Sequence, residues 1–184
     1  MNLPAVDAAL QAAIEGEHLP GVSYAVFRRN EVLARNCLGW ADREAGIALR
    51  EDHLFRAFSN TKLVTSCAAL QLLEQGRFGL EDDVGRYIPA LKDLRVLRPG
   101  ATHLEDTVPA REPVRIRHLL THTAGFTYGF TQPDHPLSAA YREARLLDPT
   151  LDLARMVEAL ARIPLLFEPG SDWSYSVATD VVGR

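Results

Sequence analysis

The first part of the chain contains two different patterns of apolar residues. Across Pro4–Glu15 the apolar residues fall on one helical face, which predicts an amphipathic surface helix. Gly21–Arg28 and residues 31–40 are instead rich in β-branched and aromatic residues, and Arg29-Asn30 between them suits a tight turn. The sequence therefore predicts a helix followed by a two-stranded hairpin.

A much longer helical pattern begins at Phe58 and ends near Gly76. Few of its positions are polar, so we expect this helix to be buried at the centre of the fold. Its apolar positions are Leu63, Cys67, Leu70, Leu73 and the neighbouring alanines. We expect Cys67 in this helix and Cys37 in the second strand to be free thiols that fill core space.

The rest of the chain is predicted to contain shorter elements. The patterns indicate a turn and short helix at residues 79–91, an exposed excursion with two short strands at 96–114, helices at 116–121 and from Asp152 to about 162, and a further helix starting at 178–183. We divide the chain into residues 1–58, which hold the first helix and hairpin, and residues 59–184, a mainly helical region. Because a lone hairpin is not a stable sheet, we expect C-terminal strands that this chain lacks.

Composition and charge argue against several classes of function. The 184 residues are 47% hydrophobic and 24% charged, as in ordinary globular domains, and the formal net charge is −4 with no basic stripe for nucleic acid. The first residues lack the basic start and apolar stretch of a secretory signal, and no segment approaches the length that spans a bilayer. We therefore expect a cytoplasmic protein that binds neither nucleic acid nor membrane.

The start of the long helix carries the strongest chemical signal. Ser59 and Lys62 are three positions apart, so they project from the same side of a helix and Lys62 can reach the serine hydroxyl. A desolvated lysine can be neutral enough to help deprotonate a serine, and the positive end of the helix dipole favours a developing oxyanion. A serine that caps a helix one turn before a lysine is also a common structural feature, so this spacing alone indicates catalysis only weakly.

The segment around Ser59 and Lys62, together with two further stretches, makes the signal specific. In chain order these are FSNTKLVTSCAALQLLEQGRFGLEDDVGRYIPAL at residues 58–91, RHLLTHTAGF at residues 117–126 and the triplet Tyr175-Ser176-Val177. Together they resemble the serine β-lactamase-related family, in particular its class C enzymes and the family VIII carboxylesterases. The resemblance implies an α/β (α+β) fold of the β-lactamase/transpeptidase type, represented here by a helical region and the N-terminal part of an antiparallel sheet.

The resemblance also implies a mechanism that needs no cofactor. Ser59 would be acylated, Lys62 and Tyr175 would exchange protons with it, and Tyr175 would later activate water or an alcohol. A phenol beside a lysine ammonium suits this role, because the cation favours the phenolate. The family's third motif, a short Lys-, His- or Trp-x-Gly strand that supplies a second oxyanion donor, does not follow Tyr175, and we expect it beyond Arg184.

One position separates the substrate classes. Val177 stands where β-lactamases usually carry an asparagine that binds the substrate's amide, so we expect an ester as the substrate. The prediction is a carboxylesterase that acts on small acyl esters. A β-lactamase or D-amino-acid peptidase is the alternative, and a penicillin-binding sensor without turnover is a second one. The presence of Tyr175 favours turnover, because a sensor could dispense with that base.

Aromatic residues close to these motifs are candidates for the substrate pocket. Tyr128, Trp173 and Phe126 flank the proposed site in sequence, and we expect them to line the pocket together with Val177. The alternative is that these aromatic rings fill a core, which is the commoner role of buried aromatics.

Two histidines and a second serine are better explained by structure than by chemistry. His118 and His122 are four positions apart but lack the glutamate of the zinc motif H-E-x-x-H, so we expect no metal site. We interpret His122 as a loop anchor that binds the backbone near Gly125. Ser23 lies in G-V-S-Y-A, which lacks the last glycine of a nucleophile elbow and continues as a strand, so it is interpreted as structural.

Overall fold

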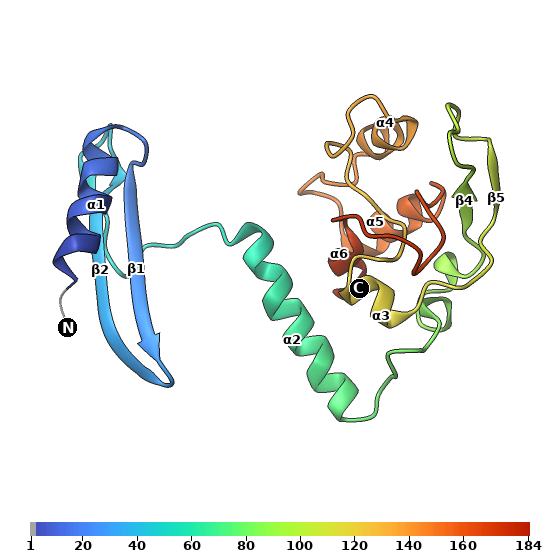
Figure 1. Ribbon diagram of the computed structural model, residues 1–184, viewed down its shortest axis with the longest axis horizontal. Coiled ribbons are helices and arrows are strands. Elements are labelled where there is room, and N and C mark those ends of the chain that lie inside the picture. Colours follow the sequence, from blue (N-terminus) through green and yellow to red (C-terminus); the bar gives the residue numbers. More distant parts are fainter. Residues whose placement is uncertain (1–2) are drawn as a thin grey trace. The chain divides into compact units, whose positions relative to one another are not determined.

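A computed structural model describes residues 3–184 and divides the chain into two compact units (Figure 1). The N-terminal unit comprises Met1–Arg56, and the larger unit comprises Ala57–Arg184. Ser59, Lys62 and Tyr175 all belong to the larger unit, so the geometry of the candidate site is determined within one compact body.

A helix and a small sheet form the N-terminal unit. Here α1 (Pro4–Glu15) is followed by the antiparallel pair β1 (Gly21–Arg28) and β2 (Glu31–Asp42), which confirms the predicted helix and hairpin. A short strand β3 (Ile47–Ala48), which the sequence pattern does not predict, pairs with the end of β2. The Asp7 carboxylate ties α1 to both long strands, because it accepts hydrogen bonds from Tyr24 Oη at 2.7 Å and Asn36 Nδ2 at 3.1 Å.

The larger unit is mainly helical, with a short two-stranded sheet. The two strands, β4 and β5, pair antiparallel, as predicted for the excursion. Asp152 caps α5 by accepting a hydrogen bond from the Arg155 backbone N–H at 2.8 Å, which confirms the predicted start of that helix. In chain order the elements are η1 (Phe58–Asn60), α2 (Thr61–Glu74), η2 (Val84–Arg86), η3 (Pro89–Leu91), β4 (Arg95–Leu97), β5 (Thr107–Pro109), α3 (Ile116–Leu120), α4 (Pro136–Glu143), α5 (Leu153–Leu160) and α6 (Ala178–Val182).

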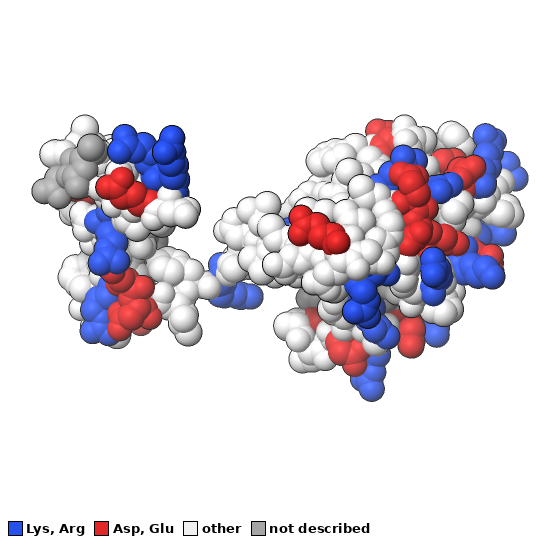
Figure 2. Space-filling view, turned by 90° about the horizontal axis from the view of Figure 1, so that it is seen from below, with Lys and Arg blue, Asp and Glu red and all other residues white. Residues whose placement is uncertain are grey.

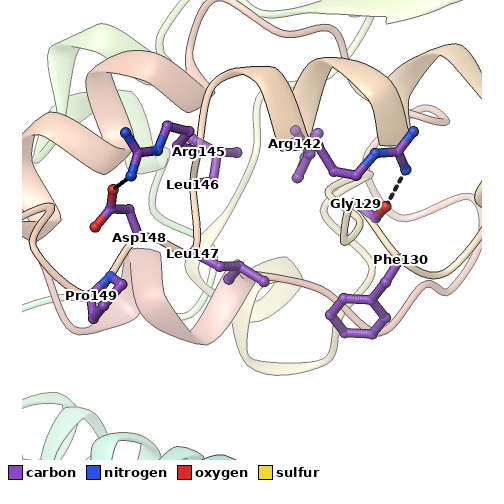
Figure 3. Close-up of a pocket in the computed structure, with 9 residues that line it drawn as sticks. Gly129, Phe130, Arg142, Arg145, Leu146, Leu147, Asp148 and Pro149 are labelled. Atoms are coloured by element: carbon purple, nitrogen blue, oxygen red, sulfur yellow. Dashed lines mark hydrogen bonds and ion pairs between the residues drawn. The ribbon is translucent and has the colours of Figure 1, made fainter.

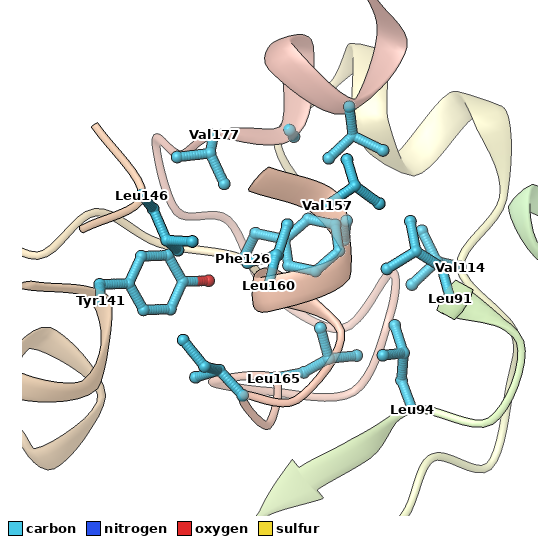
Figure 4. Packing of buried hydrophobic residues seen from close by; sticks show 14 of the residues in the cluster. Leu91, Leu94, Val114, Phe126, Tyr141, Leu146, Val157, Leu160, Leu165 and Val177 are labelled. Carbon is cyan, nitrogen blue, oxygen red and sulfur yellow. The ribbon is translucent and has the colours of Figure 1, made fainter. Parts of the chain in front are cut away.

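The core of the larger unit gathers apolar side chains from α5, α6, β4 and the loops beside them (Figure 4). Phe126 lies at its centre beside Val157 and Leu160, and all three are almost completely buried. The loop that carries Phe126 runs close to residues 165–167, and Leu166 N–H donates to the Gly125 carbonyl at 2.7 Å. Gly125 has a φ of 88°, and a β-carbon there would collide with the Phe167 carbonyl oxygen, so this approach requires glycine.

Helix α2 differs most from the prediction. Only Ala69 of α2 is buried, and Leu63 and Val64 are each 71% exposed. The helix contacts α6, and Figure 2 shows the part of the larger unit that α2 forms as almost free of charged side chains. Within the larger unit, α2 is therefore not the buried central helix that the sequence predicts. A helix with apolar residues on all faces can be buried on every side, but the larger unit covers only one side of α2.

The cysteines also differ from the prediction. Both are free thiols, as expected, but Cys67 is exposed on α2 and Cys37 is half-buried with its Sγ 3.5 Å from Ser23 Oγ. Neither therefore fills core space. Among residues 3–184 no helix has the length and apolar character required to cross a bilayer.

The structure differs from the prediction in three further segments of the larger unit. Residues 79–91 form two 3-10 helices rather than one short helix. The start of the excursion is buried, because Val96 and Leu97 of β4 join the core. Helix α4 is absent from the prediction, although Pro136 stands in its first turn and His135 Nδ1 accepts a hydrogen bond from the Leu137 backbone N–H at 3.2 Å.

Candidate active site

Ser59 and Lys62 stand at a junction of two helical segments. Ser59 lies in the 3-10 turn η1, and Lys62 is the second residue of α2, so the continuous helical path keeps the two side chains one turn apart. Phe58, directly before Ser59, has a φ of 44°, a left-handed conformation that is costly for a residue with a β-carbon. Such strain is often found beside functional groups, where the surrounding structure holds it in place.

Tyr175 contacts Ser59, although it lies near the C-terminus of the larger unit and Ser59 lies near its N-terminus. Its hydroxyl donates a hydrogen bond to Ser59 Oγ at 2.7 Å, although the two residues are 116 positions apart in sequence. The segment that carries Tyr175 is fixed by backbone hydrogen bonds to the loop after α3: Ser174 N–H donates to the His122 carbonyl at 3.0 Å, and Val177 N–H donates to the Thr127 carbonyl at 3.4 Å. These bonds place the phenol immediately before α6.

Lys62 lies close to two tyrosine rings. Its Nζ is 5.1 Å from the centre of the Tyr175 ring and 5.6 Å from that of Tyr128, within the range of cation–π attraction. Partial burial lowers the pKa of Lys62, but hydrogen bonding with Tyr128 and Tyr175 outweighs this effect and leaves the pKa raised. The expectation of a lysine made neutral by desolvation is therefore wrong, and Lys62 is an ammonium whose charge faces the phenols.

Asp180 interacts electrostatically with Lys62. It lies on α6, and burial raises the pKa of its carboxyl, while the Lys62 charge and, more weakly, His122 act in the opposite direction. The sequence contains no motif that marks this aspartate, because its relation to Lys62 arises only when α6 packs against α2.

His122 contacts both the Tyr175 ring and the residue that follows it. Its imidazole centre is 4.9 Å from that of Tyr175, and its Nδ1 lies 3.2 Å from Ser176 Oγ. The predicted anchoring role is thus altered: the side chain of His122 binds a serine hydroxyl next to Tyr175 rather than the backbone near Gly125. A φ of 58° turns its backbone into the left-handed region, which histidine tolerates better than most residues.

The two histidines do not form a metal site. His118 Nδ1 accepts a hydrogen bond from the Arg115 backbone N–H at 3.2 Å, so it caps α3 while His122 turns towards Tyr175. Within the described part of the chain, no group of three or more histidine, cysteine, aspartate or glutamate side chains is placed to hold a metal ion.

The four predicted pocket residues separate into two pairs. Tyr128 and Trp173 lie at the site: the Tyr128 ring is 5.5 Å from the Tyr175 ring, and Trp173 packs edge-on to His122 at 6.5 Å. Phe126 and Val177 are each only 1% exposed and belong to the hydrophobic core. Their prediction as substrate-binding residues is wrong, because their side chains are consumed by packing and offer no surface to a substrate.

The arrangement can move a proton between two oxygens under a fixed positive charge. A hydroxyl group, a phenol at hydrogen-bond distance and an ammonium beside the phenol are the groups that acyl transfer through a serine requires. Tyr128 adds a second phenol next to Lys62, and burial raises the pKa of Tyr128 despite that cation. Tyr128 therefore stays protonated.

Comparison with known proteins gives consistent results. A protein-family model described as Beta-lactamase matches residues 6–184. Protein Rv1367c of Mycobacterium tuberculosis is 38% identical over 184 residues, covering 100% of this chain and 45% of that protein. Esterase EstB of Burkholderia gladioli is 36% identical over 182 residues, covering 97% of this chain and 43% of the esterase.

Solved structures resemble the fold closely. EstCE1, described as a hydrolase with promiscuous acyltransferase activity, superimposes with a TM-score of 0.81 at 33% identity, covering 98% of this chain and 45% of that one. Simvastatin synthase (LovD) from Aspergillus terreus gives a TM-score of 0.74 at 28% identity, covering 100% and 46%. The chain thus spans less than half the length of the relatives that it matches.

The position of His122 gives a testable pH dependence. Burial lowers its pKa below the ordinary value of 6.5, and the Lys62 charge lowers it further while Asp180 opposes this weakly. The folded state therefore binds fewer protons at His122 than the unfolded state does, so this group reduces stability as the pH falls below 6.5. We expect Lys62→Met to raise the pKa of His122, measured by NMR titration of the histidine ring protons with His122→Asn for assignment.

Two further variants serve as controls for this titration. Lys62→Arg keeps the charge and should keep the low pKa, and Lys92→Met removes the only other lysine of the sequence and should change nothing. A His122 pKa that is the same in Lys62→Met as in the unaltered protein would show that the ammonium is not beside the imidazole.

Proposed function

The chain belongs to the beta-lactamase family, and from this premise we propose that it is a serine hydrolase that forms an acyl-enzyme at Ser59 and acts on small carboxylic esters. The observation that supports this most directly is the 2.7 Å hydrogen bond between Tyr175 Oη and Ser59 Oγ beside the Lys62 ammonium. The sequence relative described as an esterase, and the structural relative described as a hydrolase with promiscuous acyltransferase activity, fit the same chemistry.

Acylation in this proposal begins when Tyr175 loses its phenol proton to solvent. Its phenolate then takes the hydroxyl proton of Ser59 while Ser59 Oγ forms a bond to the ester carbonyl carbon. The tetrahedral intermediate then breaks its bond to the alcohol oxygen, and that oxygen receives the proton from Tyr175. Lys62 contributes as a fixed cation, because its charge favours the phenolate each time Tyr175 gives up its proton.

Deacylation repeats these steps with water as the nucleophile. Tyr175 removes a proton from water, the water oxygen bonds to the acyl carbon, and Ser59 Oγ leaves and regains its proton. An alcohol can enter in place of water, in which case the product is a new ester. The N-terminus of α2 follows Ser59 directly, so its helix dipole favours the negative charge that develops on the carbonyl oxygen.

An ester is the proposed substrate in preference to a β-lactam or a D-amino-acid peptide. The support for this preference is Esterase EstB, which is 36% identical over 182 residues. The Val177 side chain is buried in the core, so the absence of an amide there does not decide the substrate. The Tyr175 contact with Ser59 supports turnover rather than a sensor that stops at the acylated state.

Labelling with a serine-directed phosphonate tests the nucleophile. The protein, expressed from its complete reading frame, should form one covalent adduct, and peptide mapping by mass spectrometry should place it on Ser59. Ser59→Ala should abolish the adduct and lower turnover of p-nitrophenyl butyrate about a thousandfold or more.

Ser23 provides the matched control for the labelling. It is a serine in a sequence that partly resembles a nucleophile elbow, but it lies in β1 of the N-terminal unit. Ser23→Ala should keep both the adduct and the turnover. An adduct on Ser23, or full labelling of Ser59→Ala, would overturn the proposed nucleophile.

Substrate preference is tested by kinetics with two chromogenic substrates. We expect kcat/KM for p-nitrophenyl butyrate to exceed that for nitrocefin by about a hundredfold or more, because the proposed substrate is a carboxylic ester. Val177→Asn should leave this ratio unchanged and lower thermal stability, because it places an amide in the apolar core. Nitrocefin turnover as efficient as ester turnover in the unaltered protein would restore the β-lactamase alternative.

A further inference from the structure

A cavity of about 320 Å³ lies next to the aromatic residues of the candidate site (Figure 3). It lies between the loop that contains Phe130 and the chain that follows α4, and its walls are mainly the apolar side chains of Phe130, Tyr141, Leu146, Leu147 and Pro149. Its volume is at the lower end of the range for pockets that bind small molecules.

A series of ring contacts connects this cavity with the reacting groups. The Phe130 ring stacks on the Tyr128 ring, with centres 4.8 Å apart and planes 14° from parallel. Tyr128 in turn is 5.5 Å from the Tyr175 ring, and the Tyr175 hydroxyl binds Ser59. Tyr128 itself is buried, so the exposed Phe130 ring is the apolar surface that this series offers to a substrate.

The charged residues around the cavity are already satisfied by the protein. Arg142 donates hydrogen bonds to the carbonyl oxygens of Gly129 at 2.6 Å and Pro133 at 3.3 Å, and Arg145 forms an ion pair with Asp148 (Figure 3). These groups shape the walls of the cavity. An apolar group that enters the cavity displaces water from its apolar walls.

Two exposed apolar side chains border the cavity. Phe130 is 62% exposed and Leu147 is 58% exposed, while Tyr141 and Leu146 behind them are buried. Large apolar side chains that are exposed around a concave surface are typical of ligand-binding sites. An apolar ligand in the cavity would remove surface of both from water.

We propose that this cavity is a subsite that binds the uncharged alkyl or aryl part of the ester substrate. The inference rests on the proposed function, because the substrate is held at Ser59 while its apolar part extends to the Phe130 ring. That part can belong to the acyl group or to the alcohol, since both are attached to the carbonyl that Ser59 attacks. The subsite would make longer or bulkier esters better substrates than acetate esters.

Two substitutions of Leu147 change the subsite in different ways but should have the same effect. Leu147→Ser removes apolar surface, and Leu147→Trp fills part of the cavity. In the unaltered protein kcat/KM should rise from p-nitrophenyl acetate to the hexanoate or octanoate, and both variants should reduce this rise about tenfold. For each variant the rise is expressed relative to its own acetate turnover, which separates chain-length dependence from overall activity. Leu54→Ser, at a fully exposed leucine of the N-terminal unit, is the matched control and should keep the full rise.

Two substrate series distinguish the acyl side from the alcohol side. The p-nitrophenyl esters vary the acyl chain with one leaving group, and the acetates of butanol, hexanol and octanol vary the alcohol with one acyl group. A length dependence that Leu147 controls in either series supports the subsite and identifies which part of the ester occupies it. No effect of Leu147→Ser or Leu147→Trp in either series would overturn the subsite and leave the proposed function intact.

A binding measurement separates the subsite from catalysis. Calorimetry of n-octanol with Ser59→Ala should give weaker binding after Leu147→Ser is added, even if the protein hydrolyses no ester. Unchanged binding would overturn the subsite by this independent measurement. Failure of the proposed function would instead be marked by absent acetate turnover and absent phosphonate labelling of Ser59.

Discussion

The candidate site depends on one long-range hydrogen bond, from Tyr175 Oη to Ser59 Oγ at 2.7 Å. Several packing contacts must be correct for this bond to exist. Helix α6 packs against α2 and α3, the segment before α6 is tied to the loop after α3 by backbone hydrogen bonds, and Gly125 lets that loop pass close to residues 165–167. The core around Phe126 and Val177 therefore contributes to function by holding Tyr175 in place rather than by touching a substrate.

Electrostatics add a second constraint on the same groups. Burial lowers the pKa of Lys62 but hydrogen bonding with Tyr128 and Tyr175 leaves it raised. The Lys62 charge in turn lowers the pKa of His122 and opposes the rise that burial causes in the pKa of Asp180. A proton can then pass between Ser59 and Tyr175 without any change in the charge of Lys62. In the proposed mechanism the ammonium is thus an electrostatic support, and Tyr175 is the group that accepts and returns the proton.

Local sequence was sufficient for many of the elements, though not for β3 or α4, and not for their surroundings. The 3.6-residue period gave α1 its correct bounds, and β-branched and aromatic residues on either side of a turn placed β1 and β2, because these signals depend on neighbours in sequence. The spacing of Ser59 and Lys62 with the Tyr175 motif named three side chains that the structure brings together, while their catalytic roles stay a prediction. The exposure of α2, the burial of Phe126 and Val177 and the position of Asp180 were inaccessible to the same reasoning, because each depends on which distant segment packs against the residue.

The central claim is that Tyr175 moves the proton of Ser59, and Tyr175→Phe tests it most directly. Phenylalanine keeps the ring that packs on His122 and Tyr128 and removes only the hydroxyl that binds Ser59. Stopped-flow measurement of the p-nitrophenol burst gives the acylation rate of Ser59 separately from deacylation. The account predicts that acylation slows by about a hundred- to ten-thousandfold while thermal unfolding changes little. Acylation of Tyr175→Phe at nearly the rate of the unaltered protein would contradict it.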